Sequence, residues 1–187
     1  MNTQSIVGTY FLVLIALASS LACSATTSAD KKAGACPTTG EQPLAFWLGR
    51  WDVYADGKLD GHSFIESTLQ DCAVVEHWDD VSGFKGMSLF YFEPHIHQWK
   101  QVWVTDHALS PGGLKEKALV YSTADLVRFQ GTVWVAPDRM VIDRTTLRKL
   151  DDGTLSQVIE YSKDGGSTWM KSYDAAYRPA AADHLDR

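Results

Sequence analysis

The pattern of apolar and polar residues along the chain changes near Ala45. From that residue onward, short runs that alternate apolar with polar residues, or that are rich in β-branched and aromatic residues, are separated by Gly, Asp and Pro. This pattern is typical of β-strands joined by tight turns, and we expect about eight to ten strands from it. The candidate strands are residues 49–54, 60–69, 73–79, 86–92, 99–106, 119–122, 127–135, 139–149, 156–162 and 169–178.

The segments between these runs favour hairpins, because they contain residues that start turns or tolerate a positive φ. They are residues 55–57, 81–83, 111–113, 151–153 and 164–166. Only the lead-in at residues 43–48 could form a helical turn, which would cover one end of a barrel. A meander of this many strands must close on itself to hide its edges. The sequence therefore predicts an all-β fold, a single antiparallel up-and-down calycin-like barrel, with a two-sheet β-sandwich as the alternative.

The amino terminus has the layout of a secretory signal peptide, which we assign to residues 1–25. An apolar run at residues 6–18 is too short to span a bilayer and is followed by small residues, although no Lys or Arg precedes it. Ser20-Leu21-Ala22-Cys23 is close to a lipobox, which would place a lipid on Cys23. Cleavage after Ala22 or Ala25 would instead release a soluble protein. Both routes predict an exported protein, either a periplasmic or cell-envelope lipoprotein or a secreted one.

The rest of the chain divides into a tether and lead-in at residues 26–44, the barrel at residues 45–178 and a disordered tail at residues 179–187. Once Cys23 is set aside, Cys36 and Cys72 remain as a pair. In an oxidising compartment such a pair favours a disulfide, and the alternative is two free thiols.

The net charge of the chain limits the kinds of partner that it is expected to bind. The net charge is −6 and no cluster of Lys or Arg stands out, which argues against nucleic acid and against anionic lipid head groups. We expect a small apolar molecule as the partner, no cofactor, and membrane contact only through a lipid anchor on Cys23. The sequence leaves the oligomeric state open.

Aromatic residues are abundant, with seven Trp, seven Tyr and seven Phe. Alternation puts Trp99, Gln101 and Trp103 on one face of their strand. A barrel interior lined by Trp51, Trp78 and these residues would suit a small apolar or amphipathic ligand. The alternative is that the rings fill the core and leave no cavity.

Glu76 and Glu160 are candidate catalytic residues. Glu76 shares a strand face with Val74 and Trp78, so an inward carboxyl with a raised pKa could act as a general acid or base. The alternative is a structural hydrogen-bond acceptor for a strand residue such as Arg144 or Gln157. Glu160 has the same two interpretations.

Two further motifs have mainly structural interpretations. His95 and His97 form a weak metal-binding candidate, because a lone His-x-His just after Pro94 is more typical of a solvated hairpin turn. Residues 162–169 fit the Asp-box pattern Ser-x-Asp-x-Gly-x-Thr-Trp, in which the Asp accepts backbone N–H groups across a hairpin. We interpret this single copy as a hairpin fastener. No Gly-x-Ser-x-Gly, phosphate loop or His-Glu-x-x-His motif is present.

Several motifs together resemble a family of uncharacterised, often exported bacterial proteins with a lipocalin-like barrel. They are Phe46-Trp47-Leu48-Gly49-Arg50-Trp51-Asp52-Val53, Gly61-His62, Ile65-Glu66, Cys72 through Glu76-x-Trp78, Gly86-x-Ser88, Trp99-x-Gln101-x-Trp103-Val104 and the stretch from Gln157 to the Asp-box. The resemblance implies the fold, and its Gly-x-Trp opening implies that Trp51 closes the barrel floor, as in lipocalins. It brings no established catalytic residue.

Three functions follow as hypotheses. The first is an extracytoplasmic barrel that binds a small apolar or amphipathic molecule. The second is a cofactor-free isomerase, cyclase or hydrolase that uses a buried carboxylate, which requires that carboxylate to lie in a cavity without an Arg partner. The third is a non-catalytic envelope interaction domain, which an exposed apolar patch would mark.

Overall fold

The computed structural model describes residues 42–181 of the 187-residue chain. The predicted signal peptide, Cys23, Cys36 and most of the predicted tail lie outside the described residues. No helix within residues 42–181 is long and apolar enough to cross a membrane.

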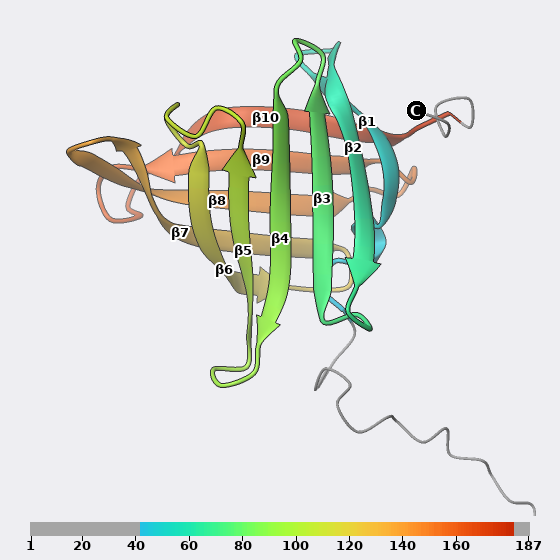
Figure 1. Cartoon of the computed structure of the whole chain (residues 1–187), viewed down its shortest axis with the longest axis horizontal. Coiled ribbons are helices and arrows are strands. Elements are labelled where there is room, and N and C mark those ends of the chain that lie inside the picture. The colour runs from blue at the N-terminus through green and yellow to red at the C-terminus, as the bar shows by residue number, and fades with distance from the viewer. Residues whose placement is uncertain (1–41, 182–187) are drawn as a thin grey trace, which may run out of the picture. The chain divides into compact units, whose positions relative to one another are not determined.

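The described residues form a closed antiparallel barrel in which each strand pairs with its neighbours in chain order and the last pairs with the first (Figure 1). The strands are β1 (Gly49–Ala55), β2 (Lys58–Thr68), β3 (Ala73–Asp80), β4 (Lys85–Glu93), β5 (Gln98–Thr105), β6 (Leu114–Ser122), β7 (Leu126–Ala136), β8 (Arg139–Lys149), β9 (Leu155–Ser162) and β10 (Met170–Pro179). The predicted all-β up-and-down barrel is confirmed, and the sandwich alternative is wrong because the β1–β10 pair closes the sheet.

One strand differs clearly from its predicted extent. β6 begins at Leu114, five residues before the predicted start at Leu119. The missed stretch contains Lys115 and Lys117, whose side chains point into the barrel and not into water. Inward lysines make the alternation of apolar and polar positions disappear, so the stretch has the composition of a solvated loop.

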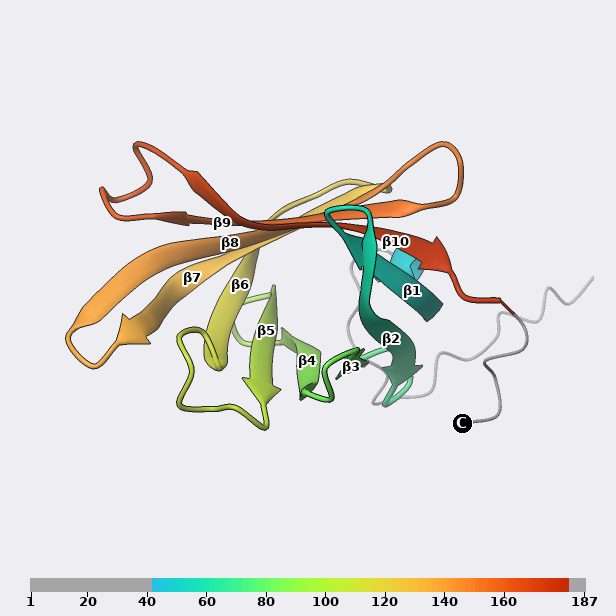
Figure 2. The same cartoon turned by 90° about the horizontal axis from the view of Figure 1, so that it is seen from above.

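The barrel has two layers whose strands cross each other. In Figure 1, β2, β3 and β4 lie in front and cross β8, β9 and β10 behind them. Seen from above, β7–β10 form one layer and β2–β5 the other (Figure 2). A single 3-10 turn, η1 (Ala45–Trp47), precedes β1, as the lead-in predicted, and lies beside β1 and β10.

One half of the barrel interior is a continuous apolar core, which we call the apolar half. Leu44 precedes η1 and Trp47 is its last residue, and both are fully buried. The Trp47 ring packs edge-on against Phe90 at 5.6 Å between centroids. Trp51 donates its indole N–H to the Trp47 carbonyl at 2.8 Å. The apolar half comprises Leu44, Trp47, Trp51, Val53, Ile65, Val74, Phe90, Trp99, Val127, Phe129, Leu147, Leu155, Ala175 and Tyr177.

The Asp-box closes the β9–β10 hairpin with the contacts predicted for it. Asp164 accepts the backbone N–H and the hydroxyl of Thr168 at 2.9 and 2.6 Å. Ser162 donates to the same carboxylate at 2.7 Å, and these hydrogen bonds lower the pKa of Asp164 well below its ordinary value. Trp169 stacks under the guanidinium of Arg144, 3.7 Å from the ring centroid. These residues therefore fasten the hairpin from outside the barrel.

Candidate functional site

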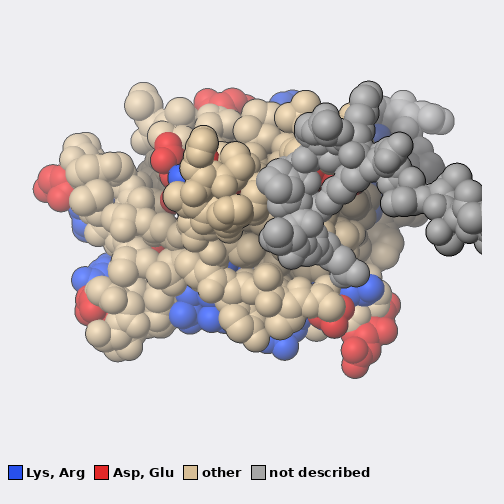
Figure 3. Space-filling view, turned by 90° about the horizontal axis from the view of Figure 1, so that it is seen from below, with Lys and Arg blue, Asp and Glu red and all other residues tan. Residues whose placement is uncertain are grey.

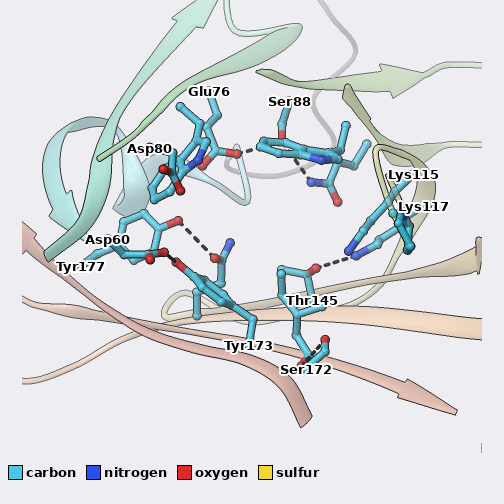
Figure 4. A pocket seen from close by; sticks show the side chains of 17 residues that line it. Asp60, Glu76, Asp80, Ser88, Lys115, Lys117, Thr145, Ser172, Tyr173 and Tyr177 are labelled. Atoms are coloured by element: carbon cyan, nitrogen blue, oxygen red, sulfur yellow. Dashed lines mark hydrogen bonds between the residues drawn. The ribbon is translucent and has the colours of Figure 1, made fainter. Parts of the chain in front are cut away.

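The other half of the interior holds a cavity of about 360 Å³, which we call the polar half. Its walls differ in charge (Figure 4). Asp60 on β2 and Glu76 and Asp80 on β3 form an acidic wall, and Lys115 and Lys117 on β6 lie across the cavity from them.

Single strands contribute to both halves. On β3, alternate residues point inward: Val74 is fully buried in the apolar half, Glu76 is 4% exposed, and Trp78 and Asp80 line the cavity. The intervening His77 is exposed on the outer face. Pleating therefore decides which side chains face the interior, and position along the strand decides which half they enter.

Glu76 lies at the boundary between the halves, within a hydrogen-bonded group. The Ser63 hydroxyl donates to Oε1 at 3.1 Å and the Ser88 hydroxyl donates to Oε2 at 2.8 Å. Gln101 Nε2 in turn donates to the Ser88 oxygen at 3.2 Å. The Gln101 carbonyl oxygen Oε1 is buried and has no hydrogen-bond partner.

Burial raises the pKa of Glu76 from its ordinary 4.5 to about 6. The hydrogen bonds from Ser88 and Ser63 favour the ionised carboxylate and limit the rise, and the charge of His77 and the Tyr177 hydroxyl act in the same direction. Among the described residues, no Lys or Arg forms an ion pair with Glu76. Glu76 is thus a cavity carboxyl that gains or loses its proton at a higher pH than an exposed glutamate.

The basic wall is held by one carboxylate. Asp143 on β8 forms ion pairs with Lys117 and, at 3.0 Å, with Lys115. Lys117 also donates to the Thr145 hydroxyl at 2.6 Å. Burial lowers the pKa of Lys117 from 10.5 to about 8, and the charge of Asp143 opposes that fall. Two ammonium groups thus share one carboxylate.

Two tyrosines of β10 complete the lining. The Tyr173 hydroxyl donates to Asp60 Oδ2 at 2.6 Å, and the Tyr177 hydroxyl donates to Gln157 Oε1 at 3.2 Å. Burial is the main cause that raises the pKa of both phenols above the ordinary value. Both tyrosines therefore stay neutral and act as hydrogen-bond donors at physiological pH.

Two tryptophan rings that line the cavity lie in close contact with glycines. A Cβ atom at Gly61 would lie 2.6 Å from the Trp78 ring, and one at Gly86 would lie 2.1 Å from the Trp103 ring. Since real Cβ atoms do not approach so closely, these positions have to be glycine for the rings to stay where they are. Both rings line the cavity.

The structure brings together part of the predicted ligand-binding set. Glu76, Trp78, Gln101 and Trp103 line the cavity, whereas Trp51 and Trp99 pack in the apolar half.

Glu160 does not line the cavity. Its carboxylate forms an ion pair with Arg144 at 2.7 Å, while the neighbouring Gln157 and Ile159 face the interior. The catalytic hypothesis requires a carboxylate without an Arg partner, and Glu76 meets that condition while Glu160 does not.

The site also contains groups that the sequence did not single out. They are Asp60, Asp80, Ser88, Lys115, Lys117, Asp143, Thr145, Tyr173 and Tyr177. The sequence signal that could have found some of them is the alternation in Lys115-Glu116-Lys117 and in Asp143-Arg144-Thr145, where every second side chain points inward. All of these residues are polar, so alternation alone did not distinguish the inward from the outward face.

The remaining predicted residues lie away from the cavity. His95 and His97 are exposed in the β4–β5 turn, and within residues 42–181 no group of three or more His, Cys, Asp or Glu could hold a metal ion. Cys72 is half-buried and free of any disulfide to a described residue, and because Cys36 lies outside that range the disulfide stays a prediction.

The outer face of β4–β6 carries exposed apolar side chains. Met87 pairs with Val104 across β4 and β5, and Val104 pairs with Leu114 across β5 and β6. All three are more than one-third exposed, as is the neighbouring Leu89. Figure 3 views the molecule from below and not onto this face; on the part not drawn in grey, acidic and basic side chains occur in small groups among other residues. Exposed apolar side chains of this kind are what the interaction-domain hypothesis requires.

Neither family models nor curated proteins give a relative from which to transfer a function. No family model matches the chain, and no curated protein matches it significantly. The class of protein is therefore defined by the fold and the site alone: a closed ten-stranded antiparallel barrel with a charged internal cavity. The resemblance to exported lipocalin-like proteins stays a prediction.

Proposed function

We propose that this protein binds one small amphipathic molecule in the polar half of its barrel. The rings of Trp78 and Trp103 contact the apolar part of that molecule, and Glu76 and Gln101 orient its polar part. The proposal follows the predicted export of the chain and places binding outside the cytoplasm.

The observation that carries the proposal is the buried carbonyl oxygen of Gln101, which has no partner although its residue is only 7% exposed. Leaving a buried acceptor without a hydrogen bond costs about 1 to 3 kcal/mol. A ligand that donates to this oxygen would remove that cost. The cavity volume of about 360 Å³ also lies within the range of roughly 300 to 1,000 Å³ that is usual for small-molecule sites.

The lining favours an amphipathic ligand over a purely apolar one. Glu76, Lys117 and Gln101 present polar atoms to the cavity, and an apolar molecule would bury these atoms without replacing their hydrogen bonds to water. The two tryptophan rings provide the apolar contact area. A ligand with an apolar body and hydrogen-bonding groups satisfies both parts of the lining.

Fluorescence titration tests the proposal with a neutral amphipathic probe, N-phenyl-1-naphthylamine. We expect a saturable increase in probe emission with one molecule bound per chain, and about tenfold weaker binding in Trp103→Ala, because that ring is part of the site. Trp134→Ala is the matched control, since Trp134 is 56% exposed and does not line this cavity. Equal loss in both variants, or no saturable binding together with no retained small molecule in native mass spectrometry, would contradict the proposal.

A second candidate function is acid–base catalysis by Glu76. The observation that favours it is a cavity carboxyl with a pKa of about 6 and no Lys or Arg partner among the described residues. In this case Glu76 would remove a proton from a carbon next to a carbonyl group of the bound molecule. NMR in D₂O would detect exchange of that carbon-bound hydrogen for deuterium, and Glu76→Gln should stop the exchange without preventing binding.

A further inference from the structure

We propose that the molecule bound in this cavity is an organic ammonium ion whose N–H groups contact the acidic wall formed by Asp60, Glu76 and Asp80. The inference rests on the proposed function, because it assumes that the cavity binds a small molecule. It adds the charge and the orientation of that molecule.

The balance of charge around the cavity favours a cation. Four carboxylates are present, namely those of Asp60, Glu76, Asp80 and Asp143, against the ammonium groups of Lys115 and Lys117. When all six groups are ionised, two negative charges are left without compensation. A cationic ligand would reduce this excess and an anionic ligand would increase it.

The two lysines do not neutralise the acidic wall. Both are held at the far side by Asp143, and Lys117 is further fixed by Thr145. Among residues 42–181, no Lys or Arg forms an ion pair with any of the three acidic-wall carboxylates. The negative charge is therefore localised at one side of the cavity, where a cationic group would bind.

Hydrogen bonding favours a ligand that donates. Ser63 and Ser88 both donate to Glu76, and Tyr173 donates to one oxygen of Asp60. Asp80 accepts from Ser82 through Oδ1 only. Second carboxylate oxygens at Asp60 and Asp80 thus remain as acceptors, together with Gln101 Oε1. An ammonium group with several N–H donors matches a wall that is rich in acceptors.

The aromatic rings add a second attraction for a cation. Trp78 and Trp103 line the cavity with Asp80, and each ring lies in close contact with a glycine. The face of an indole ring carries negative electrostatic potential and attracts a cation placed over it. The same two rings would contact the organic part of the ligand.

Calorimetric titration with three probes of matched shape tests the inference at pH 7.5. The probes are 2-phenylethylammonium, the neutral 2-phenylethanol and the anionic 3-phenylpropionate. We expect the ammonium ion to bind at least about tenfold more tightly than the alcohol and the carboxylate to bind most weakly. Asp80→Asn should remove most of the preference for the ammonium ion. Asp79→Asn makes the same change on the adjacent residue, which is exposed and paired with Lys85, and should leave the preference unchanged.

Each other outcome overturns the inference. If the alcohol or the carboxylate binds as tightly as the ammonium ion, the cavity binds small molecules but does not select a cation. If the Asp79 and Asp80 variants lose affinity equally, the effect is one of net charge and not of the acidic wall. If none of the three probes binds while N-phenyl-1-naphthylamine does, the cation assignment is wrong and the proposed binding function stands. Failure of the naphthylamine titration is a separate result, which contradicts the binding function itself. Thermal unfolding of both variants verifies that they are folded.

Discussion

The two halves of the barrel interior are built by the same strands but differ in polarity, in charge and in how completely side chains fill them. On β4, Phe90 packs in the apolar half, while Ser88, one inward position away, donates a hydrogen bond to Glu76. On β5, Trp99 is part of the apolar core and Trp103 lines the cavity. The difference teaches that inward orientation does not mean apolar surroundings. A strand can stabilise the fold with one end and supply a binding site with the other.

The halves also contribute to stability with opposite signs. Burial of a large apolar side chain such as Phe90 stabilises the fold by about 1.5 to 3 kcal/mol. Burial of Glu76 and Lys117 is unfavourable for the charged form of each, and both pKa values move towards neutrality for that reason. Functional sites are commonly maintained at such a cost.

The largest expected effect is on stability, when one inward side chain of the apolar half is truncated and the loss is compared with that for one of the polar half. Phe90→Ala should lower the free energy of unfolding by about 3 to 5 kcal/mol, because it leaves a hole among Trp47, Phe129 and their neighbours. Ser88→Ala should cost less, about 1 to 3 kcal/mol, since it removes the hydrogen bond to Glu76 and the one accepted from Gln101. Urea unfolding of both variants measures the difference. Similar losses for the two would mean that the halves are not energetically distinct.

Replacing Glu76 tests whether the polar half makes the stability of the protein depend on pH. The pKa of Glu76 in the folded protein, about 6, lies above the ordinary 4.5, so its contribution to stability is fully present below pH 4.5 and is lost as pH rises through 6. A shift of this size corresponds to about 2 kcal/mol. Glu76→Gln should therefore remove a decline of about 2 kcal/mol between pH 4.5 and pH 7.

Urea unfolding at a series of pH values tests this. Tyr173 and Tyr177 stay neutral over this range, and the other charge that acts on the pKa of Glu76 is that of the outward His77. For this reason Glu66→Gln, which removes the negative charge beside His77 on the outer face, is the control. An unchanged pH profile in Glu76→Gln would show that the carboxyl is not responsible.

A smaller effect should follow from adding one methyl group at Gly86. The new Cβ would collide with the Trp103 ring and push it into the cavity. We expect a loss of about 1 to 2 kcal/mol in unfolding free energy, at the lower end for overpacking because the cavity gives the ring room to move. Binding of N-phenyl-1-naphthylamine should weaken as well. In a Trp103→Ala background, the same Gly86→Ala change should lower the unfolding free energy much less. An equal loss would show that the strain does not come from contact with the Trp103 ring.

The smallest effect should come from the other candidate carboxylate. Glu160→Gln breaks a partly exposed ion pair with Arg144 and should change the unfolding free energy by about 1 kcal/mol or less. Probe binding should be unaffected, because the Glu160 side chain does not line the cavity. Calorimetric titration of the Glu160→Gln and Glu76→Gln variants with the same probe compares the two carboxylates. Weaker probe binding in the Glu160 variant would contradict the site described above.

Sequence reasoning succeeded where inward residues are apolar and outward residues are polar. Val74, Glu76 and Trp78 were correctly assigned to one face, and most strand bounds agree closely with the structure. It failed at Lys115 and Lys117 because inward lysines have the composition of an exposed loop. Their pairing with Asp143 depends on β6 and β8 lying on either side of β7, which is information about topology and not about local pattern.

Alternation predicts which side of the sheet a side chain faces, but it does not predict where that side chain lies along the barrel axis. For this reason Trp51 and Trp99 were grouped with Trp78 and Trp103, although the first two belong to the apolar half and the other two to the cavity. Export, lipid on Cys23 and the Cys36–Cys72 bond remain predictions, because Cys23 and Cys36 lie outside the described residues.

Closure of the barrel by its first and last strands determines when the cavity can form. Every other strand pair joins neighbours in the chain and can form locally, whereas β1 and β10 are separated by more than 100 residues and pay a larger entropy of loop closure. Two of the cavity residues, Tyr173 and Tyr177, belong to that last strand. During synthesis the binding site therefore cannot be completed until the final strand has left the ribosome, and a chain truncated before Met170 should expose two open sheet edges and aggregate.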